Sequence, residues 1–203
     1  MRKIQTFFSI ICFVLVGLAS GDARAVDRSP NDDVRVELQS QVADVYTSQI
    51  GVRELTGHND GVAVEKYLAV TGFGKGYSWC AAFVSWSFQE ARVTALKNAW
   101  APSWFPPNKT IYAKGKHDSL KPDKADVFGI YYEAKKRIGH VGFIDDWPVS
   151  GDYAITVEGN TNSAGSREGD GVYRKRRLKA NIFKVSRWVD KPELKVESKK
   201  LKA

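Results

Sequence analysis

Cysteine is scarce in this sequence, which contains only Cys12 and Cys80 among its 203 residues. The chain is nevertheless 43% hydrophobic and 12% aromatic, which is enough to build a core without metals or disulfides. The same hydrophobic content excludes an intrinsically disordered protein. The sequence has no internal repeat and no low-complexity block. Its length fits one globular domain with a leader segment.

Long apolar runs are also lacking. At the N-terminus, the candidate for a membrane span is the apolar run at residues 10–18. This run is too short, because about 20 apolar residues are needed to cross a bilayer. Arg2 and Lys3 precede this run, and an Ala-Arg-Ala sequence at residues 23–25 follows it. This order is typical of a cleaved secretory signal peptide, here residues 1–25. A retained membrane anchor is the alternative. We therefore expect an exported protein, periplasmic or secreted, with no stable membrane insertion after cleavage.

Export would leave Cys80 as the single thiol, because Cys12 lies in the apolar run and would leave with the signal peptide. Cysteines in an oxidising compartment usually pair, so a lone thiol there indicates a reactive role. The alternative is a small buried hydrophobic residue, which is what most free cysteines are. The surroundings of Cys80 decide between these two interpretations.

Negative charge is in deficit. The chain carries a formal net charge of +8, of which about +6 remains after loss of the signal peptide. Lysines recur in residues 191–203, a basic tail that is usually solvated. The excess could draw the protein to cell-wall polymers, acidic lipids or nucleic acid. The signal peptide and the lack of an aromatic RNA-binding motif argue against nucleic acid as a partner.

Between the signal peptide and the basic tail, the spacing of apolar residues is first that of helices and then that of strands. Apolar spacing predicts helices at 34–50, 62–70 and 81–92. Residues 95–125 contain four prolines and no clear period, so an irregular segment is expected there. Alternating segments predict strands at 127–132, 141–147, 153–157, 172–177 and 183–189. Helices followed by an antiparallel sheet form an α+β domain, placed at 34–190 after a linker at 26–33.

Cys80 falls at the N-terminal end of the helix predicted for 81–92. Unpaired backbone N–H groups and the helix dipole favour negative charge there, so the pKa of the thiol should fall. A thiolate at this position is a nucleophile, and neighbouring N–H groups can hold a developing oxyanion. Tyr77, Trp79 and the glycines at 72, 74 and 76 suit a cleft wall where a substrate approaches.

The nucleophile needs a base, and the sequence has only three histidines. His117 lies in a charged loop, and His58 lies in a turn-rich loop upstream of Cys80. His140 opens a predicted strand directly after Gly139, so it can project into a cleft while the strand anchors it. We expect His140 to be the general base, with His58 as the alternative.

Glu158 and Asn160 follow the strand predicted at 153–157. If the strands at 141–147 and 153–157 pair antiparallel, both residues come close to His140. Either could orient the imidazole and stabilise the imidazolium, although the segment could also be only a polar turn. Because Glu158 and Asn160 are two residues apart on what should be extended chain, their side chains should point the same way. We expect Glu158 to contact His140 directly because an anion stabilises imidazolium more than an amide does.

Three motifs together resemble the CHAP family, the cysteine, histidine-dependent amidohydrolases/peptidases. They are Ser78-Trp79-Cys80 with the helix that follows, Gly139-His140-Val141-Gly142, and Val157-Glu158-Gly159-Asn160. CHAP proteins are peptidoglycan hydrolases of the papain-like NlpC/P60 superfamily, and the likeness runs from about residue 51 to about residue 189.

The resemblance implies a papain-like α+β fold and peptidoglycan as the partner. It assigns Cys80 as nucleophile, His140 as base, Glu158 as orienting acid and Asn160 as a supporting polar residue. The bond cut would be either the muramoyl–L-alanine amide or a peptide bond, with no cofactor. Many phage-type members have glutamine before the cysteine, where it helps the oxyanion hole; this chain has Trp79 instead. A catalytically inactive wall-binding module is the alternative function.

Two further features concern the substrate and metals. Tyr77, Trp79 and Trp104 are the candidates for substrate contact. Trp100, Trp104 and Phe105 could stack on sugar rings beside the cleft, but packing of their loop against the body is the favoured interpretation. The loop at 57–61 has one carboxylate and lacks EF-hand spacing, so no metal site is expected.

Overall fold

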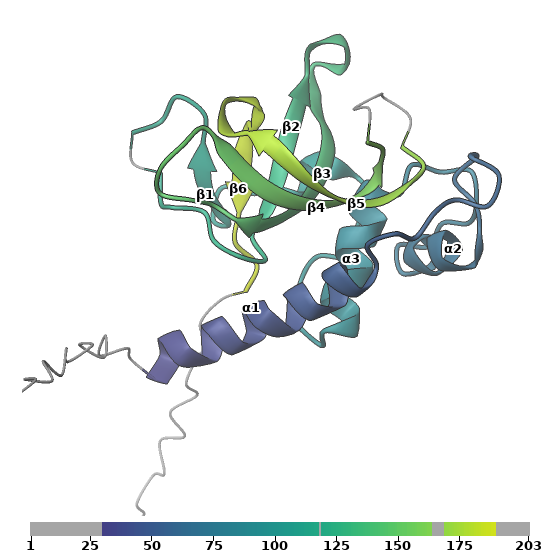
Figure 1. The fold of residues 1–203 in the computed structure, drawn as a ribbon, viewed down its shortest axis with the longest axis horizontal. Coiled ribbons are helices and arrows are strands. Elements are labelled where there is room, and N and C mark those ends of the chain that lie inside the picture. The colour runs from purple at the N-terminus through teal and green to yellow at the C-terminus, as the bar shows by residue number, and fades with distance from the viewer. Residues whose placement is uncertain (1–29, 118, 164–168, 190–203) are drawn as a thin grey trace, which may run out of the picture.

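A computed structural model describes residues 30–117, 119–163 and 169–189 (Figure 1). The predicted signal peptide and basic tail lie outside these residues. Across the described ranges, none of the helices combines the length and apolar character needed to cross a membrane.

Three helices form the N-terminal half of the domain. They are α1 (Pro30–Ser48), α2 (Val62–Ala69) and α3 (Cys80–Glu90). Helix α1 includes residues 30–33, so the prediction of a linker as far as residue 33 is wrong. Pro30 suits the first helical position because its fixed φ is helical and it needs no N–H partner there. Asp32 and Asp33 place negative charge in the first turn, where it interacts favourably with the helix dipole.

A six-stranded antiparallel sheet forms the other half, in the order β1-β6-β2-β3-β4-β5. The strands are β1 (Thr110–Ala113), β2 (Val127–Tyr132), β3 (Arg137–Asp146), β4 (Tyr153–Thr161), β5 (Gly171–Leu178) and β6 (Lys184–Ser186). The expected α+β class is confirmed. Strand β1 was not predicted, because four half-buried residues inside a proline-rich segment carry too short an alternation.

Helix α3 forms the centre of the main core. Its residues from Cys80 to Phe88 are buried, and Figure 1 shows it between α1 and the strands. Phe83 and Phe88 both meet Phe143 of β3, with ring centroids 6.2 and 5.4 Å apart. Each buried phenylalanine contributes about 1.5–3 kcal/mol. The start of α3 is therefore held firmly against the strands.

A second apolar cluster lies apart from the helices. It consists of Phe128, Ile144, Ala154, Ile182 and Val185. Along β3, Val141 and Phe143 belong to the main core, whereas Ile144 belongs to this second cluster. The sheet is thus apolar on both faces, and polar side chains buried beside it need partners within the protein.

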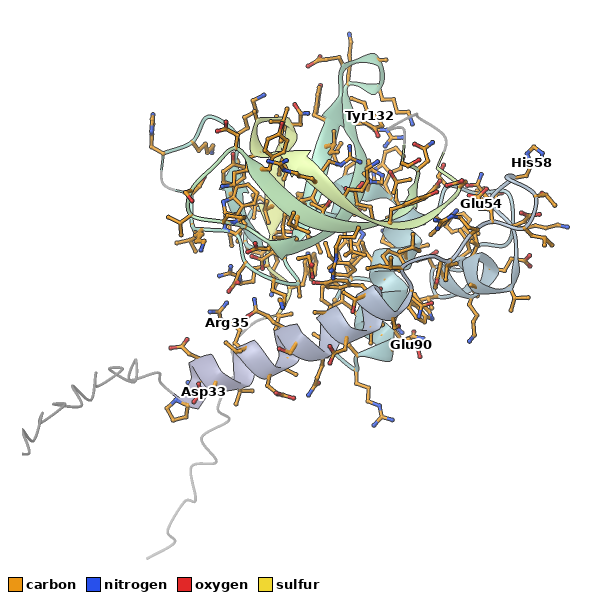
Figure 2. All side chains as sticks on the ribbon, viewed as in Figure 1. Asp33, Arg35, Glu54, His58, Glu90 and Tyr132 are labelled. Carbon is orange, nitrogen blue, oxygen red and sulfur yellow. The ribbon has the colours of Figure 1, made fainter. Side chains whose placement is uncertain are left out.

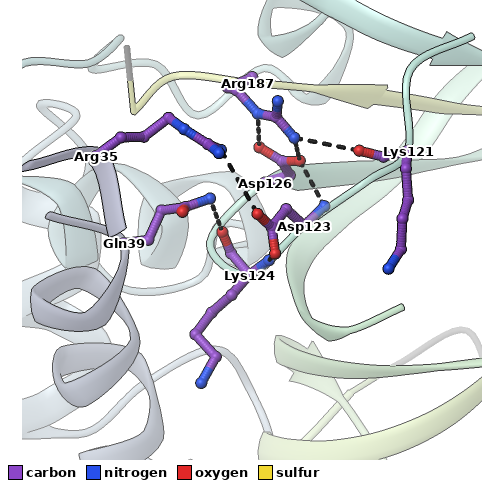
Figure 3. Close-up of polar contacts among 7 residues, drawn as sticks. All are labelled: Arg35, Gln39, Lys121, Asp123, Lys124, Asp126 and Arg187. Carbon is purple, nitrogen blue, oxygen red and sulfur yellow. Dashed lines mark hydrogen bonds and ion pairs between the residues drawn. The ribbon is translucent and has the colours of Figure 1, made fainter. Parts of the chain in front are cut away.

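Polar contacts fix the segment that leads into β2 (Figure 3). Gln39 of α1 donates to the Lys124 carbonyl at 2.7 Å, and Arg35 pairs with Asp123 at 3.5 Å. The buried Asp126 accepts from Arg187 Nε at 2.9 Å and from Nη2 at 2.7 Å. Because β2 pairs with β3, these contacts help to position the strand that carries His140.

Candidate active site

Cys80 is the first residue of α3, after Trp79 at the N-cap. The Trp79 carbonyl accepts the first helical bond, from Phe83 N–H at 2.8 Å. Burial alone would raise the pKa of the Cys80 thiol. The hydrogen bond and charge of His140, helped by the Val141 and Ala81 N–H groups, instead hold this pKa below its ordinary value. The geometry therefore favours a thiolate.

His140 lies on β3 and is buried beside Cys80. Burial would lower the pKa of its imidazole, but hydrogen bonds to Cys80 and Glu158 and their charges raise this pKa to about 9. His140 Nε2 lies 2.9 Å from Glu158 Oε2, which leaves Nδ1 for the thiol. The arrangement can hold a thiolate–imidazolium pair near neutral pH.

Glu158 on β4 is fully buried and uses both carboxylate oxygens. Oε2 accepts from His140, and Oε1 accepts from Thr156 Oγ1 at 2.6 Å. Arg177 donates to both, from Nε to Oε1 at 2.7 Å and from Nη2 to Oε2 at 2.5 Å. Burial would raise the pKa of this carboxyl, but Arg177 and His140 hold it far below the usual range. Glu158 is therefore ionised beside the imidazolium.

Arg177 is the residue that sequence reasoning missed. It lies on β5 within a basic run that reads as a solvated strand. The sequence carries no signal for it, because residues 174–177 are all basic; only the structure shows that Tyr173, Lys175 and Arg177 are partly buried whereas Arg174 and Arg176 are exposed. Antiparallel pairing of β4 with β5 brings the partly buried set beside Glu158.

Two glycines in the motifs allow this close assembly. A Cβ on Gly142 would lie 3.0 Å from Glu158 Cγ and 2.9 Å from Phe128 Cε1. A Cβ on Gly159 would lie 2.7 Å from Trp79 Cζ3 and 2.8 Å from Phe83 Cβ. Gly142 therefore makes room for the carboxylate, and Gly159 lets the start of α3 approach β4.

The backbone at Asn160 differs from the extended conformation that was expected. Its φ of 52° is left-handed, and the β4–β5 register shifts between Glu158 and Thr161. Both residues lie within β4, but Asn160 departs from the extended backbone on which the expectation of parallel side chains rested. A bulge inserts a residue and re-aims the side chain. Asn160 still lines a cleft together with Cys80 and His140.

That cleft has a volume of about 910 Å³ and is called the polar cleft below. Cys80 and His140 lie in its wall. Other lining residues come from the loop after α1, from β2 and the turn that follows it, from the ends of β4 and β5, and from the segment before β6: Asn59, Tyr131, Lys135, Asn160, Arg177 and Asn181. The cleft gives a substrate access to an otherwise buried thiol.

Two of the three candidates for substrate contact are buried in the core. Trp79 is fully buried and donates its indole N–H to Glu54 Oε1 at 2.8 Å. Trp104 is also fully buried, and its indole N–H donates to the Asn98 carbonyl at 3.2 Å. Large indoles with an internal partner for the N–H are stable in a core. Tyr77, by contrast, is 57% exposed and lines a smaller cleft beside Cys80.

The remaining polar candidates are placed away from the thiol. Figure 2 shows His58 directed away from the body of the domain, at the outer edge of its loop. His117 is likewise exposed. Asp60 accepts from Thr56 N at 2.9 Å and from Thr56 Oγ1 at 2.7 Å. This carboxylate stabilises its own loop. Within the described ranges, no group of three or more His, Cys, Asp or Glu side chains could hold a metal ion.

Comparison with known proteins found a family model that matches the segment carrying this site. Residues 72–160 match the family model of the CHAP domain, and this segment contains Cys80, His140, Glu158 and Asn160. A solved structure of a mutated resuscitation promoting factor interacting protein RipA is similar, with 14% identity and a TM-score of 0.44. The similarity covers 80% of this chain and 67% of that chain. A search of curated proteins found no match.

Proposed function

We propose that this chain, which carries a CHAP domain at residues 72–160, is an exported cysteine hydrolase that cleaves amide bonds in bacterial peptidoglycan. The family supports peptidoglycan as the substrate. The observation that carries the chemistry is the chain of contacts from Cys80 through His140 to Glu158, opening onto the polar cleft.

The reaction follows from the protonation states at the site. The Cys80 thiolate attacks the carbonyl carbon of an amide, and the tetrahedral intermediate places negative charge on the carbonyl oxygen. The imidazolium of His140 gives its proton to the leaving amine as the C–N bond breaks. Water, activated by the neutral His140, then hydrolyses the thioester and releases the acid.

The oxyanion would be held by backbone rather than by the residue before the nucleophile. The indole N–H of Trp79 is turned toward Glu54, so it does not replace the glutamine found in many phage-type relatives. The N–H of Cys80 opens α3, where intrahelical acceptors are lacking. We assign that N–H as a donor to the oxyanion.

Glu158 would keep the imidazolium in place throughout the reaction. Because Arg177 and Thr156 also bond its carboxylate, Glu158 cannot rotate without losing several charge-assisted hydrogen bonds. Asn160, at the edge of the polar cleft, would fix the substrate or the cleft wall. In this proposal Glu158 acts on the histidine, and Asn160 acts on the substrate or the cleft wall.

Export is the second part of the proposal, and the leader pattern at residues 1–25 supports it. A periplasmic or secreted location gives the enzyme access to the wall. It also accounts for a single reactive thiol in a chain with no second cysteine outside the leader. Protein partners play no part in this proposal.

Hydrolysis of purified peptidoglycan by the protein without residues 1–25 tests the function. The Cys80→Ala variant should lose at least about 10³-fold of the rate, as for removal of other catalytic nucleophiles. Its thermal unfolding should match the parent, and it should still sediment with peptidoglycan. Comparable hydrolysis by the variant would exclude a cysteine mechanism. Sedimentation by both proteins without hydrolysis by either would indicate a binding module instead.

A further inference from the structure

Cys80 lies where two clefts meet. Beside the polar cleft is a smaller one of about 330 Å³, called the aromatic cleft below. The two clefts share Ser78, Cys80, Lys135 and Gly139 in their linings. The aromatic cleft continues past the thiol to Phe73, Tyr77, Trp100 and Arg137. A substrate at Cys80 can therefore extend in two directions of different character.

Exposed aromatic rings distinguish the smaller cleft. Phe73, Tyr77 and Trp100 are 41%, 57% and 51% exposed. The rings of Phe73 and Tyr77 have centroids 4.9 Å apart, and the Arg137 guanidinium lies 4.0 Å from the centre of the Trp100 ring. Rings held in position but left open to solvent beside a nucleophile indicate a ligand surface.

The components of peptidoglycan differ in what they can offer to such rings. Its stem peptides consist mainly of small, amide-linked and charged residues. Its sugars present faces of C–H groups that match the flat, apolar face of an aromatic ring. The partner in this polymer that best fits the aromatic cleft is therefore a sugar.

We propose that the aromatic cleft binds the N-acetylmuramoyl residue and that the bond at Cys80 is the amide joining its lactyl group to L-alanine. This assignment rests on the proposed function and decides between its two bond classes. Cys80 sulfur forms a thioester with the lactyl carbonyl carbon, and the C–N bond breaks. The L-alanine nitrogen takes the proton of His140, and water then releases the lactyl carboxylate.

The polar cleft then receives the stem peptide. Lys114 and Lys135 line it against one carboxylate from Glu133, whereas the lining Arg177 is paired with Glu158. Stem peptides carry free carboxylates, so this excess of positive charge is complementary to them. In the aromatic cleft the guanidinium of Arg137 is stacked on Trp100, and Lys135 lies where the two clefts meet. The exposed rings on one side of the thiol and Lys114 on the other thus orient the substrate.

Product analysis tests the bond assignment. The protein without residues 1–25 is incubated with purified peptidoglycan, and the products are identified by mass spectrometry. We expect sugar chains with free lactyl carboxylates and stem peptides with a free L-alanine amino group. Cleavage only within the peptides would overturn this assignment and leave the proposed hydrolase intact. No cleavage of any amide would overturn both.

Ligand binding tests the role of the rings separately. The Cys80→Ala protein is titrated with N-acetylmuramoyl-L-alanyl-D-isoglutamine and with the same dipeptide without the sugar. We expect the sugar to tighten binding about tenfold, and Trp100→Ala or Tyr77→Ala to remove most of this gain.

Tyr153→Ala provides the matched control, because Tyr153 is also an exposed ring beside a guanidinium, that of Arg176 at 3.8 Å. Tyr153 lines neither the polar nor the aromatic cleft. The control should keep the full gain from the sugar. Equal binding of the two ligands by the Cys80→Ala protein, or a gain that survives Trp100→Ala and Tyr77→Ala together, would overturn the proposal.

Discussion

Arg177 holds Glu158 through two hydrogen bonds, one to each carboxylate oxygen, at 2.7 and 2.5 Å. Glu158, held in this way, fixes the position of the His140 ring through the hydrogen bond between Oε2 and Nε2. The guanidinium also keeps a fully buried carboxylate ionised, since burial by itself would raise the pKa of Glu158. Arg177 thus acts on the imidazole as a positioning residue.

Replacement of Arg177 by methionine should raise the pKa of Glu158, because the carboxylate loses one of its two cationic partners. Once Glu158 is protonated, the His140 imidazolium loses its counter-charge, so the acid edge of the pH–rate profile should move to higher pH. The fold should also lose up to about 3–5 kcal/mol, because a buried carboxylate loses one of its two cationic partners. The measurements are kcat against pH and denaturant unfolding.

Two variants separate the role of Arg177 from general instability. Arg177→Lys keeps the charge but loses the two-pronged geometry, so its acid edge should lie between those of the parent and the methionine variant. Arg176→Met removes the neighbouring, exposed arginine and should leave the edge in place. An unmoved edge in a folded Arg177→Met protein would contradict the positioning role.

Glu158→Gln should lower the pKa of His140 from about 9, because an amide stabilises the imidazolium less than a carboxylate does. The thiolate–imidazolium pair exists between the pKa of the thiol and that of the imidazolium. The alkaline edge of its window should therefore move down in pH, with a loss of about tenfold or more in rate. The pH profile of Cys80 alkylation measures the window.

Asn160→Ala is the comparison for Glu158→Gln. Asn160 lines the polar cleft, so its loss should reduce turnover with little change in the alkylation profile. A profile moved by Asn160→Ala and unchanged by Glu158→Gln would reverse the two roles. The site would then follow papain, in which an asparagine orients the histidine.

The Cys80 thiol should be more acidic than free cysteine, because His140 and nearby N–H groups lower its pKa. Its alkylation midpoint should therefore fall below about 8.5. In His140→Ala burial remains while the imidazolium is lost, so the midpoint should rise above that of the parent. The exposed His58 supplies the control, and His58→Ala should leave the midpoint unchanged. A parent midpoint equal to that of free cysteine would exclude the ion pair.

Gly159→Ala should destabilise the fold, since its Cβ would lie 2.7 Å from Trp79 and 2.8 Å from Phe83. Overpacking of this kind costs about 1–3 kcal/mol, and relief would push the start of α3 away from β4. We expect a lower unfolding midpoint together with reduced activity. Gly74→Ala is the matched control, because a Cβ at Gly74 meets nothing within 4 Å. Equal stability of the two variants would show that this contact is not tight.

The sequence by itself determined the order of the elements and the placing of the thiol. Helical spacing and strand alternation are local periods, so α3 and strands β2 to β6 could be located before any contact was known. The position of Cys80 at a helix N-terminus follows from the same local signal. The antiparallel pairing of β3 with β4 needed only adjacency in the chain, and it brings Glu158 toward His140.

Only the tertiary structure decided which side chains face the site. Trp79 and Trp104 are apolar and aromatic, as cleft residues also are, and packing against other elements sends both into the core. Arg177 lies on another strand from Glu158, and its role depends on the β4–β5 pairing and on burial that leaves the carboxylate without water. Asn160 reaches the polar cleft through a bulge. Local periodicity does not specify these long-range contacts, so the residues that support the site could not be predicted from the sequence alone.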